Sequence, residues 1–323
     1  MSLGLMRLWN DLVRQALRGL APLMCTPAMA DVAYITCQTG DALSVIDLGR
    51  SADVTTWDVP GKPAGVATGT NYVLTVSADS KVIRKLDAAT GAVLVQTKLD
   101  GGPIGVSLDD QRQRVYVSDW YNARIWVLDL DTLSTISILT TGEAPAGLSL
   151  SEDGRWLASA DKEANQVTLF DAQSLTKIHQ VAVGTRPFGL NFAPDGRLFV
   201  GNVGSDDLTV VDPDLGRAVA TVPVGQRPYG VSFAKGRAFV TNQYENTVSV
   251  IDTDSLQHVQ TIDVGEYPEG VDTVADGTKV VLANWFDNTI SIIDANTLSV
   301  IETLPTCDGP RAFGRFLVKG AVQ

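Results

Sequence analysis

Short apolar runs alternate with polar residues along most of the chain, and one such pattern returns. The segment AFVTNQYENTVSVID, residues 238–252, has two β-branched or alternating apolar runs around a polar turn, which is typical of a hairpin. Nearly the same pattern follows as VVLANWFDNTISIID at residues 280–294, and weaker copies precede it five times. We therefore expect a repeat protein made of copies of one β-structured unit.

Two sequence markers recur in phase every 40–42 residues and define seven units. The first marker is the Asp that ends the second apolar run, at Asp47, Asp87, Asp129, Asp171, Asp212, Asp252 and Asp294. The second is Pro-x-Gly, which begins at Pro63, Pro103, Pro145, Pro187, Pro228 and Pro268, with a looser version from Pro310 to Gly314. A fixed period in two independent markers indicates one structural unit per repeat.

Each unit supplies four strand signals, which in the sixth copy are YGVSFA, AFVTN, TVSVID and HVQTIDV. Turn signals such as Pro194-Asp195-Gly196 separate the first two strands. After the third strand comes Asp-x-x-x-Leu, in which the Asp side chain can accept backbone N–H groups and fix a tight turn. Four antiparallel strands in about 40 residues form a propeller blade. We predict an all-β, seven-bladed β-propeller, since no unit has room for the helix of an α/β fold.

The two ends of the chain predict how the ring closes. The repeats begin at a second strand, AYITC, and end with a lone first strand, FGRFLV, from Phe313 to Val318. We expect this C-terminal strand to complete the blade that the N-terminal strands begin, because closure removes long exposed strand edges.

Two cysteines replace residues that other repeats share. Cys37 occupies the position held by Asn202, Asn242 and Asn284, and Cys307 the position held by Gly184, Gly225 and Gly265. Both fall in the closing blade on the same face, where adjacent antiparallel strands bring Cα atoms within disulfide reach. We predict a Cys37–Cys307 disulfide; two unpaired cysteines and a thiolate metal site are the alternatives.

Residues 1–30 differ from the repeats. Three arginines precede a modest apolar stretch, and Ala28-Met29-Ala30 comes before Asp31, which is typical of an export signal with its cleavage site. The alternative is an interfacial amphipathic helix, because Leu, Trp and Val residues share one helical face opposite the arginines. We favour a removed signal peptide at 1–30, a single propeller domain at 31–323 and a periplasmic or secreted protein. No run approaches the roughly 18 apolar residues of a membrane-spanning helix.

In this strand order, the loops before each Pro-x-Gly and the loops inside each middle hairpin share one face, the funnel face. Aromatic and Arg side chains, the types that dominate interface hot spots, gather in these loops. The candidate ligand- or partner-binding residues are Trp120, Tyr121, Arg186, Phe188, Arg227, Tyr229, Tyr244, Tyr267, Glu269, Trp285, Phe286 and Arg311.

Each of these residue types also has a structural alternative. For the rings, the alternative is that they pack between blades and plug the mouth of the central tunnel. Arg186 and Arg227, which stand one repeat apart, either hold an anionic ligand or pair with a nearby Asp such as Asp161. Asp119 and Asp161 end second strands, where we expect Asp and Asn to satisfy loop backbone groups, with a bound cation as the less favoured reading.

Charge and missing motifs narrow the function. The net charge of −12 argues against a nucleic-acid binder. The only two histidines, His179 and His258, fall on predicted outer strands. The chain has no C-x-x-C-H haem motif, no Gly-rich phosphate loop and no Ser/His/Asp set on the funnel face. We expect no catalytic residues, metal or cofactor, although carboxylates and arginines leave an enzyme open.

The hairpin motif resembles the YVTN repeat of bacterial β-propellers, and further copies are YITCQTGDALSVID, VYVSDWYNARIWVLD and LFVGNVGSDDLTVVD. The resemblance covers residues 32 to about 319. It implies similarity to periplasmic propellers associated with quinoprotein (PQQ-dependent) oxidation systems and to propeller subunits of amine dehydrogenases. Propeller lactonases look similar in fold.

Taken together, these patterns predict an exported, monomeric, non-catalytic binding or scaffold propeller. Its funnel face is expected to bind a protein partner or a small anionic ligand. The alternatives are an accessory propeller of a quinoprotein oxidation system and a lactonase-like hydrolase.

Overall fold

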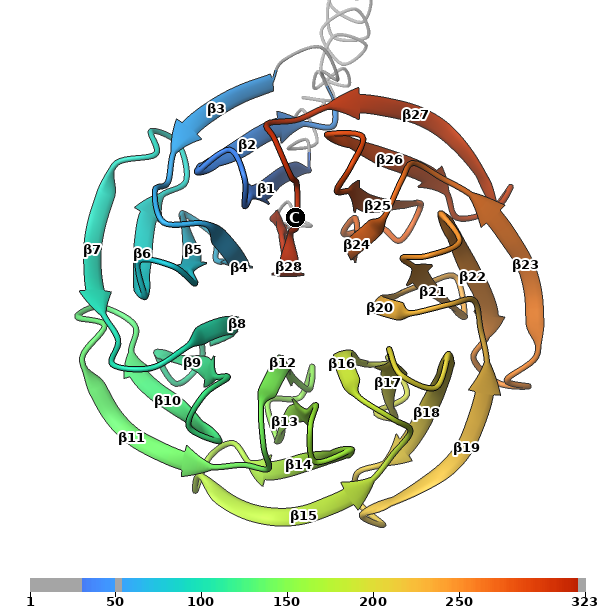
Figure 1. Ribbon diagram of the computed structural model, residues 1–323, viewed down its shortest axis with the longest axis horizontal. Helices are drawn as coiled ribbons and strands as arrows, with labels where there is room; N and C mark the ends of the chain where they lie inside the picture. The colour runs from blue at the N-terminus through green and yellow to red at the C-terminus, as the bar shows by residue number, and fades with distance from the viewer. Residues whose placement is uncertain (1–30, 50–53, 319–323) are drawn as a thin grey trace, which may run out of the picture.

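Seven β-sheets stand around a central axis in a closed ring (Figure 1). The computed structural model describes residues 31–49 and 54–318, so the predicted signal peptide at 1–30 lies outside the described residues. Blade 1 has the strand order β29-β1-β2-β3, and blades 2 to 7 follow in chain order with their strands arranged from the axis outward. The four strands of each blade pair antiparallel. The predicted seven-bladed propeller is confirmed.

The strands recur at equivalent positions in each blade. The inner strands are β4 (Pro63–Thr68), β8 (Pro103–Asp109), β12 (Pro145–Leu150), β16 (Pro187–Phe192), β20 (Pro228–Ala234), β24 (Pro268–Thr273) and β29 (Leu317–Val318). The second strands are β1 (Val32–Cys37), β5 (Tyr72–Ser77), β9 (Arg114–Asp119), β13 (Trp156–Asp161), β17 (Leu198–Asn202), β21 (Arg237–Asn242) and β25 (Lys279–Asn284).

The two outer positions complete each blade. The third strands are β2 (Ala42–Asp47), β6 (Val82–Asp87), β10 (Arg124–Asp129), β14 (Gln166–Asp171), β18 (Asp207–Asp212), β22 (Thr247–Asp252) and β26 (Thr289–Asp294). The outer strands are β3 (Val54–Asp58), β7 (Val93–Lys98), β11 (Thr135–Thr140), β15 (Thr176–Ala182), β19 (Arg217–Pro223), β23 (His258–Asp263) and β27 (Ser299–Pro305). One further strand, β28 (Phe313–Arg315), lies near the axis (Figure 1).

The core lies between neighbouring blades. Second and third strands are buried on both faces, as β13 shows with all six residues buried, because each sheet packs against a sheet on either side. One cluster joins Phe239 of blade 6 to Val280 of blade 7. Outer strands alternate exposed and covered residues. His179 and His258 lie on outer strands β15 and β23, as predicted.

The Asp that ends each third strand fixes the following turn, as its sequence motif predicts. Asp252 accepts hydrogen bonds from the backbone N–H and the hydroxyl of Ser255 at 2.8 and 2.7 Å. These bonds lower the pKa of Asp252. The Leu of the motif then takes a left-handed backbone conformation, with φ of 57° at Leu256, and completes the tight turn.

Pro-x-Gly lets the inner strands approach one another at the axis. A Cβ on Gly189 would lie 1.9 Å from the carbonyl oxygen of Tyr229 in the next blade, so only glycine fits. The same contact recurs around the ring at Gly65, Gly105, Gly147, Gly230, Gly270 and Gly314. The motif therefore sets the diameter of the channel.

The C-terminal segment closes the ring, but not as one continuous strand. Only β29 pairs with β1, through Ala33 and Leu317 and through Val32 and Val318. Before it, β28 pairs in parallel with β4 of blade 2. The expectation of a single strand from Phe313 to Val318 needs this correction: the segment first crosses into the channel and then returns to blade 1.

The predicted disulfide is present. Cys37 and Cys307 are bonded, with Cα atoms 5.7 Å apart and a sequence separation of 270. In other blades the same space holds an Asn against a Gly: a Cβ on Gly265 would lie 2.5 Å from the Asn284 side chain. The disulfide takes the place of this pair in blade 1.

Candidate functional site

The loops that precede the inner strands and the loops of the middle hairpins meet on one face of the ring. Backbone hydrogen bonds join them, from Gln243 N to Arg227 O at 3.2 Å and from Trp285 N to Tyr267 O at 3.1 Å. Arg186, Arg227 and Tyr267 have positive φ values of 56–58°, which turn the chain into the inner strand. The structure thus places the candidate residues of the sequence analysis on the funnel face.

Three rings from distant parts of the chain pack together at the axis and form a plug. Phe188 lies 4.6 Å from Tyr229 and 5.1 Å from Phe313 between ring centroids. All three are buried, and Trp120 packs against Phe188 at 6.1 Å. For Phe188 and Tyr229 the structure selects the alternative of rings that plug the tunnel mouth, because neither ring is accessible to a partner.

Phe313 is a plug residue that the sequence analysis did not single out. Its signal is the looser spacing between Pro310 and Gly314, which has two residues more than a regular Pro-x-Gly. These extra residues carry the chain inward, where Phe313 reaches the axis beside Tyr229 at 5.6 Å.

A network of polar side chains covers the plug on the funnel side. Arg311 donates to the Tyr229 hydroxyl at 2.8 and 2.9 Å and to Gln38 Oε1 at 2.9 Å. Arg311 Nε also lies 3.2 Å from Glu269 Oε2. Gln243 then donates to Glu269 Oε1 at 2.9 Å and accepts from Arg227 Nε at 2.8 Å. The network links three neighbouring blades, 6, 7 and 1.

Burial governs the protonation of this network. Removal from water raises the pKa of Glu269 to about 7, although the positive charge of Arg311 acts in the opposite direction. Burial also raises the pKa of the Tyr229 hydroxyl. Glu269 is therefore a buried carboxyl group beneath the funnel face, with a pKa near neutral.

Four rings form an aromatic patch beside the network. Tyr267 contacts Tyr244, Phe286 and Trp285, with centroid distances of 5.8, 4.9 and 6.4 Å. Tyr244 and Phe286 are 59 and 64 % exposed. Arg311 lies over Trp285 at 5.0 Å, and Arg227 lies over Tyr244 at 5.0 Å. Exposed apolar rings beside cations are typical of an interaction surface.

A second group of charged side chains lies on the funnel face, around Trp120 and Glu163. Lys162 lies 4.6 Å from the Trp120 ring, and both Lys162 and Arg186 lie 3.4 Å from carboxylate oxygens of Glu163. Burial lowers the pKa of Lys162, and the positive charges of Arg186 and Arg227 lower it further. Tyr121, which is 74 % exposed, stands on the rim.

Arg186 and Arg227 stand one repeat apart but have different partners. Arg186 pairs with Glu163 and not with Asp161, which was the alternative considered from sequence. Within residues 31–49 and 54–318, Arg227 has no carboxylate at ion-pair distance; its guanidinium contacts Gln243 and Tyr244. Arg227 is therefore available to an anionic group.

The acidic residues that end second strands have structural roles. Asp119 accepts from Gly102 N at 2.8 Å and pairs with Arg124 at 2.7 Å, and Asp161 accepts from Gly142 N at 2.8 Å. Both satisfy loop backbone groups, as expected. The equivalent asparagines differ, because Asn242 donates to the hydroxyls of Thr247 and Ser249 on the neighbouring strand.

Comparison with known proteins relates the chain to seven-bladed propellers. The family model described as Lactonase, 7-bladed beta-propeller matches residues 95–234, less than half of the chain. Hydrazine synthase of Kuenenia stuttgartiensis is similar in structure, with a TM-score of 0.71 and 16 % identity over 83 % of this chain and 97 % of that one. A functionally unknown protein from Desulfotomaculum acetoxidans DSM 771 gives a TM-score of 0.73 and 13 % identity over 89 % and 98 %.

No curated protein matches the chain in sequence. Among the residues that the structure describes, no helix is long and apolar enough to cross a membrane. At identities this low, structural similarity concerns the fold, and one fold serves many functions. The comparisons therefore support a seven-bladed propeller with a partial likeness to the lactonase propellers.

Proposed function

We propose that this protein is an exported binding propeller whose funnel face holds an anionic group next to an apolar one. The occupant is a protein segment or a small molecule that carries a carboxylate or phosphate. The observation that carries the proposal is Arg227, a cation without a carboxylate partner among the described residues, placed between the aromatic patch and Lys162. The disulfide is compatible with an oxidising compartment.

The chemistry of the face fits such an occupant. Arg presents a fork of donors to a carboxylate or phosphate, and the exposed rings of Tyr244 and Phe286 supply apolar contact. The plug makes the face shallow, because Phe188 and Tyr229 are buried beneath it. A shallow face with exposed rings favours a protruding peptide segment over an engulfed ligand.

The test is a fluorescence titration, with the funnel-face residues Trp120 and Trp285 as reporters. The probes are the capped peptides acetyl-Glu-Phe-Glu-amide and acetyl-Lys-Phe-Lys-amide, and benzoate as the small anion. We expect the acidic peptide to bind at least tenfold more tightly than the basic one, and R227Q to weaken it at least fivefold. R217Q, on outer strand β19, is the matched control and should change nothing.

The alternatives within this test are distinct. Tighter binding of benzoate than of the acidic peptide identifies a small-molecule site. Equal binding of the acidic and basic peptides, or an R227Q protein that binds like wild type, would contradict the proposal.

An accessory place in a quinoprotein oxidation system is a narrower form of the same proposal, supported by the YVTN-like repeats. It predicts that a PQQ-dependent dehydrogenase encoded beside this protein binds the purified wild-type chain and not R227Q. Surface plasmon resonance with the two purified proteins tests it.

Lactone hydrolysis is the second candidate, favoured by the family model over residues 95–234 and by Glu269. A carboxyl group with a pKa of about 7 is suited to act as a general base toward water. Turnover of γ-butyrolactone or glucono-δ-lactone that E269Q abolishes, while E245Q retains it, would support this candidate. Absence of turnover across a lactone panel would reject it.

A further inference from the structure

A cavity lies in the central channel, on the opposite side of the plug from the funnel face. It has a volume of about 280 Å³, below the roughly 300–1,000 Å³ of sites for drug-sized ligands. Its walls are the later residues of the inner strands, from Ala67 in β4 to Asp272 in β24, and Tyr229 and Phe313 form its inner end. The cavity therefore suits a ligand of few atoms.

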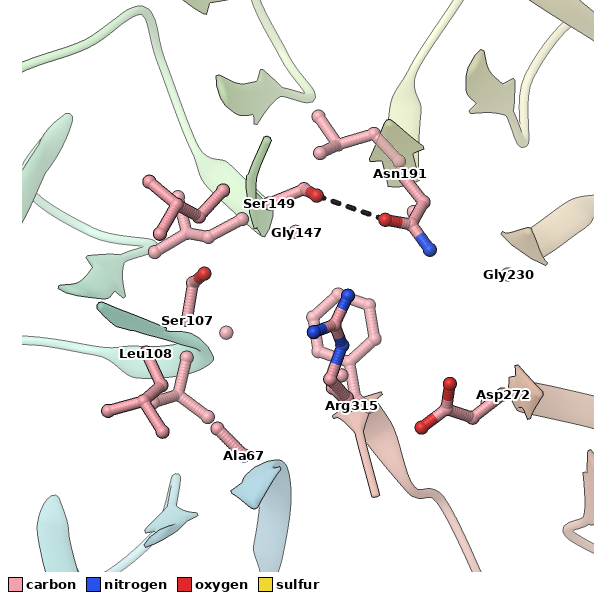
Figure 2. Close-up of a pocket in the computed structure, with 18 of the residues that line it drawn as sticks. Ala67, Ser107, Leu108, Gly147, Ser149, Asn191, Gly230, Asp272 and Arg315 are labelled. Atoms are coloured by element: carbon pink, nitrogen blue, oxygen red, sulfur yellow. Dashed lines mark hydrogen bonds between the residues drawn. The ribbon is translucent and has the colours of Figure 1, made fainter. Parts of the chain in front are cut away.

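Arg315 stands within this cavity, among inner-strand residues of blades 2 to 7 (Figure 2). It is the last residue of β28, whose parallel pairing with β4 carries the chain into the channel. Asp272 then fixes the next two residues, because its Oδ2 accepts from the backbone N–H groups of Phe316 and Leu317, each at 3.0 Å. The fold thus holds Arg315 in place by its backbone.

The guanidinium of Arg315 has no partner of its own. Within the described part of the chain, it forms no hydrogen bond and no ion pair, and Asp272 stands to one side of it in the cavity wall (Figure 2). Burial raises the pKa of Asp272, and the positive charge of Arg315 opposes that rise. A cation and a carboxylate therefore face the same small cavity with a gap between them.

The remaining lining supplies hydrogen-bonding groups and further negative charge. Ser149 and Asn191 are hydrogen-bonded to each other at 3.1 Å, and Ser107 faces the cavity from β8 (Figure 2). Exposed Asp110 and Glu152 belong to the lining where the inner strands end. One guanidinium thus stands among three carboxyl groups, which disfavours a polyanion and favours a ligand with both charges.

We propose that this channel cavity binds a zwitterionic amino acid, with its carboxylate on Arg315 and its ammonium group toward Asp272. The α-carboxylate receives a two-pronged contact from the guanidinium. The ammonium group, one carbon away, lies toward the carboxyl groups of the cavity. The serine and asparagine side chains hydrogen-bond to the ammonium or carboxylate atoms that Arg315 and Asp272 leave free. This site is separate from the funnel face and does not depend on the function proposed for it.

The test compares three ligands of equal chain length by isothermal titration calorimetry. L-2-aminobutyrate carries both charges, butyrate only the carboxylate, and n-butylamine only the ammonium group. We expect L-2-aminobutyrate to bind at least tenfold more tightly than either single-charge ligand. R315Q should weaken it at least tenfold, and R315K should recover part of the loss. R217Q should bind as wild type, since Arg217 lies on outer strand β19 and does not line the cavity.

Three results would overturn the proposal. Binding of butyrate as tight as that of L-2-aminobutyrate would make the cavity a simple anion site. An R315Q protein with unchanged affinity, or no binding of L-2-aminobutyrate at all, would reject the proposed amino-acid site. Loss of binding in R227Q but not R315Q would move the ligand to the funnel face, which rejects the channel site and leaves the funnel proposal standing. Because Arg315 has no partner among the described residues, R315Q is expected to fold, and a thermal melt checks this.

Discussion

Glu269 is a carboxyl group beneath the funnel face, in contact with a guanidinium, a phenol and an amide. Desolvation raises its pKa from 4.5 to about 7, despite these partners. The native protein therefore binds this proton more tightly than the unfolded chain does. Stability from this group is fully present below pH 4.5 and is lost as the pH rises toward 7.

We predict that the E269Q substitution removes this pH dependence. The change in pKa corresponds to about 3 kcal/mol between the two protonation states. The comparison is the free energy of unfolding of wild type minus that of E269Q, both measured with urea. This difference should fall by up to about 3 kcal/mol from pH 4.5 to pH 8, with most of the loss below pH 7. The control is E245Q, because Glu245 is exposed and should leave the profile unchanged. A difference that is constant with pH would show that folding does not raise the pKa of Glu269.

At the scale of the element, the Pro-x-Gly start of each inner strand brings seven blades to one axis. The closest approaches differ from blade to blade, since a Cβ on Gly189 would lie 1.9 Å from Tyr229 O and a Cβ on Gly230 would lie 2.9 Å from Glu269 O. The neighbouring atom is a backbone oxygen in both cases, so the strand itself must move to admit a methyl group.

We predict that alanine substitutions destabilise the protein in the order of these contacts. G189A should lower the free energy of unfolding by about 3 kcal/mol or more, and G230A by about 1 kcal/mol. The turn glycine Gly196, with φ of 88° and no atom within 4 Å of its Cβ position, is a control that carries backbone strain alone, of about 1 kcal/mol. Thermal and urea unfolding measure the series, and equal costs for G189A and G230A would contradict the close-contact account.

At the scale of the whole molecule, the ring is closed by short pairings and one covalent bond. Strand β29 contributes two residues to blade 1, so few ladder hydrogen bonds join the ends. The Cys37–Cys307 bond joins the same blade across 270 residues. A crosslink over so long a loop strongly restricts the unfolded chain in the chain-entropy account.

We predict that loss of this bond lowers the free energy of unfolding by about 2–5 kcal/mol. The informative variant is C37N/C307G, because it restores the Asn–Gly pair of blades 5 to 7. Ser44 then stands where Ser249 accepts a hydrogen bond from Asn242 in blade 6. The variant removes the crosslink and keeps the local packing. Urea unfolding with and without dithiothreitol measures the effect; wild-type stability in the variant would show that the bond adds nothing beyond that packing.

Much of the architecture followed from the sequence. The in-phase Asp and Pro-x-Gly markers predicted seven blades, the Asp-x-x-x-Leu motif predicted its turn, and the exceptions at Cys37 and Cys307 predicted the disulfide. These features depend on short-range geometry repeated at a fixed period. Each repeat can therefore be compared with the others at equivalent positions. The sequence also predicted which loops share the funnel face, because strand order within a blade determines the face of each loop.

The axis of the ring was decided by tertiary structure. Whether Phe188 and Tyr229 bind a partner or plug the channel depended on Phe313, which arrives from the far end of the chain. The division of the last segment into β28 and β29, and the entry of Arg315 into the channel, depended on the space left by six regular inner strands. A repeat pattern specifies one blade and its contacts with its nearest neighbours. Packing at the axis depends on side chains from all the blades together, which the pattern of one repeat does not specify.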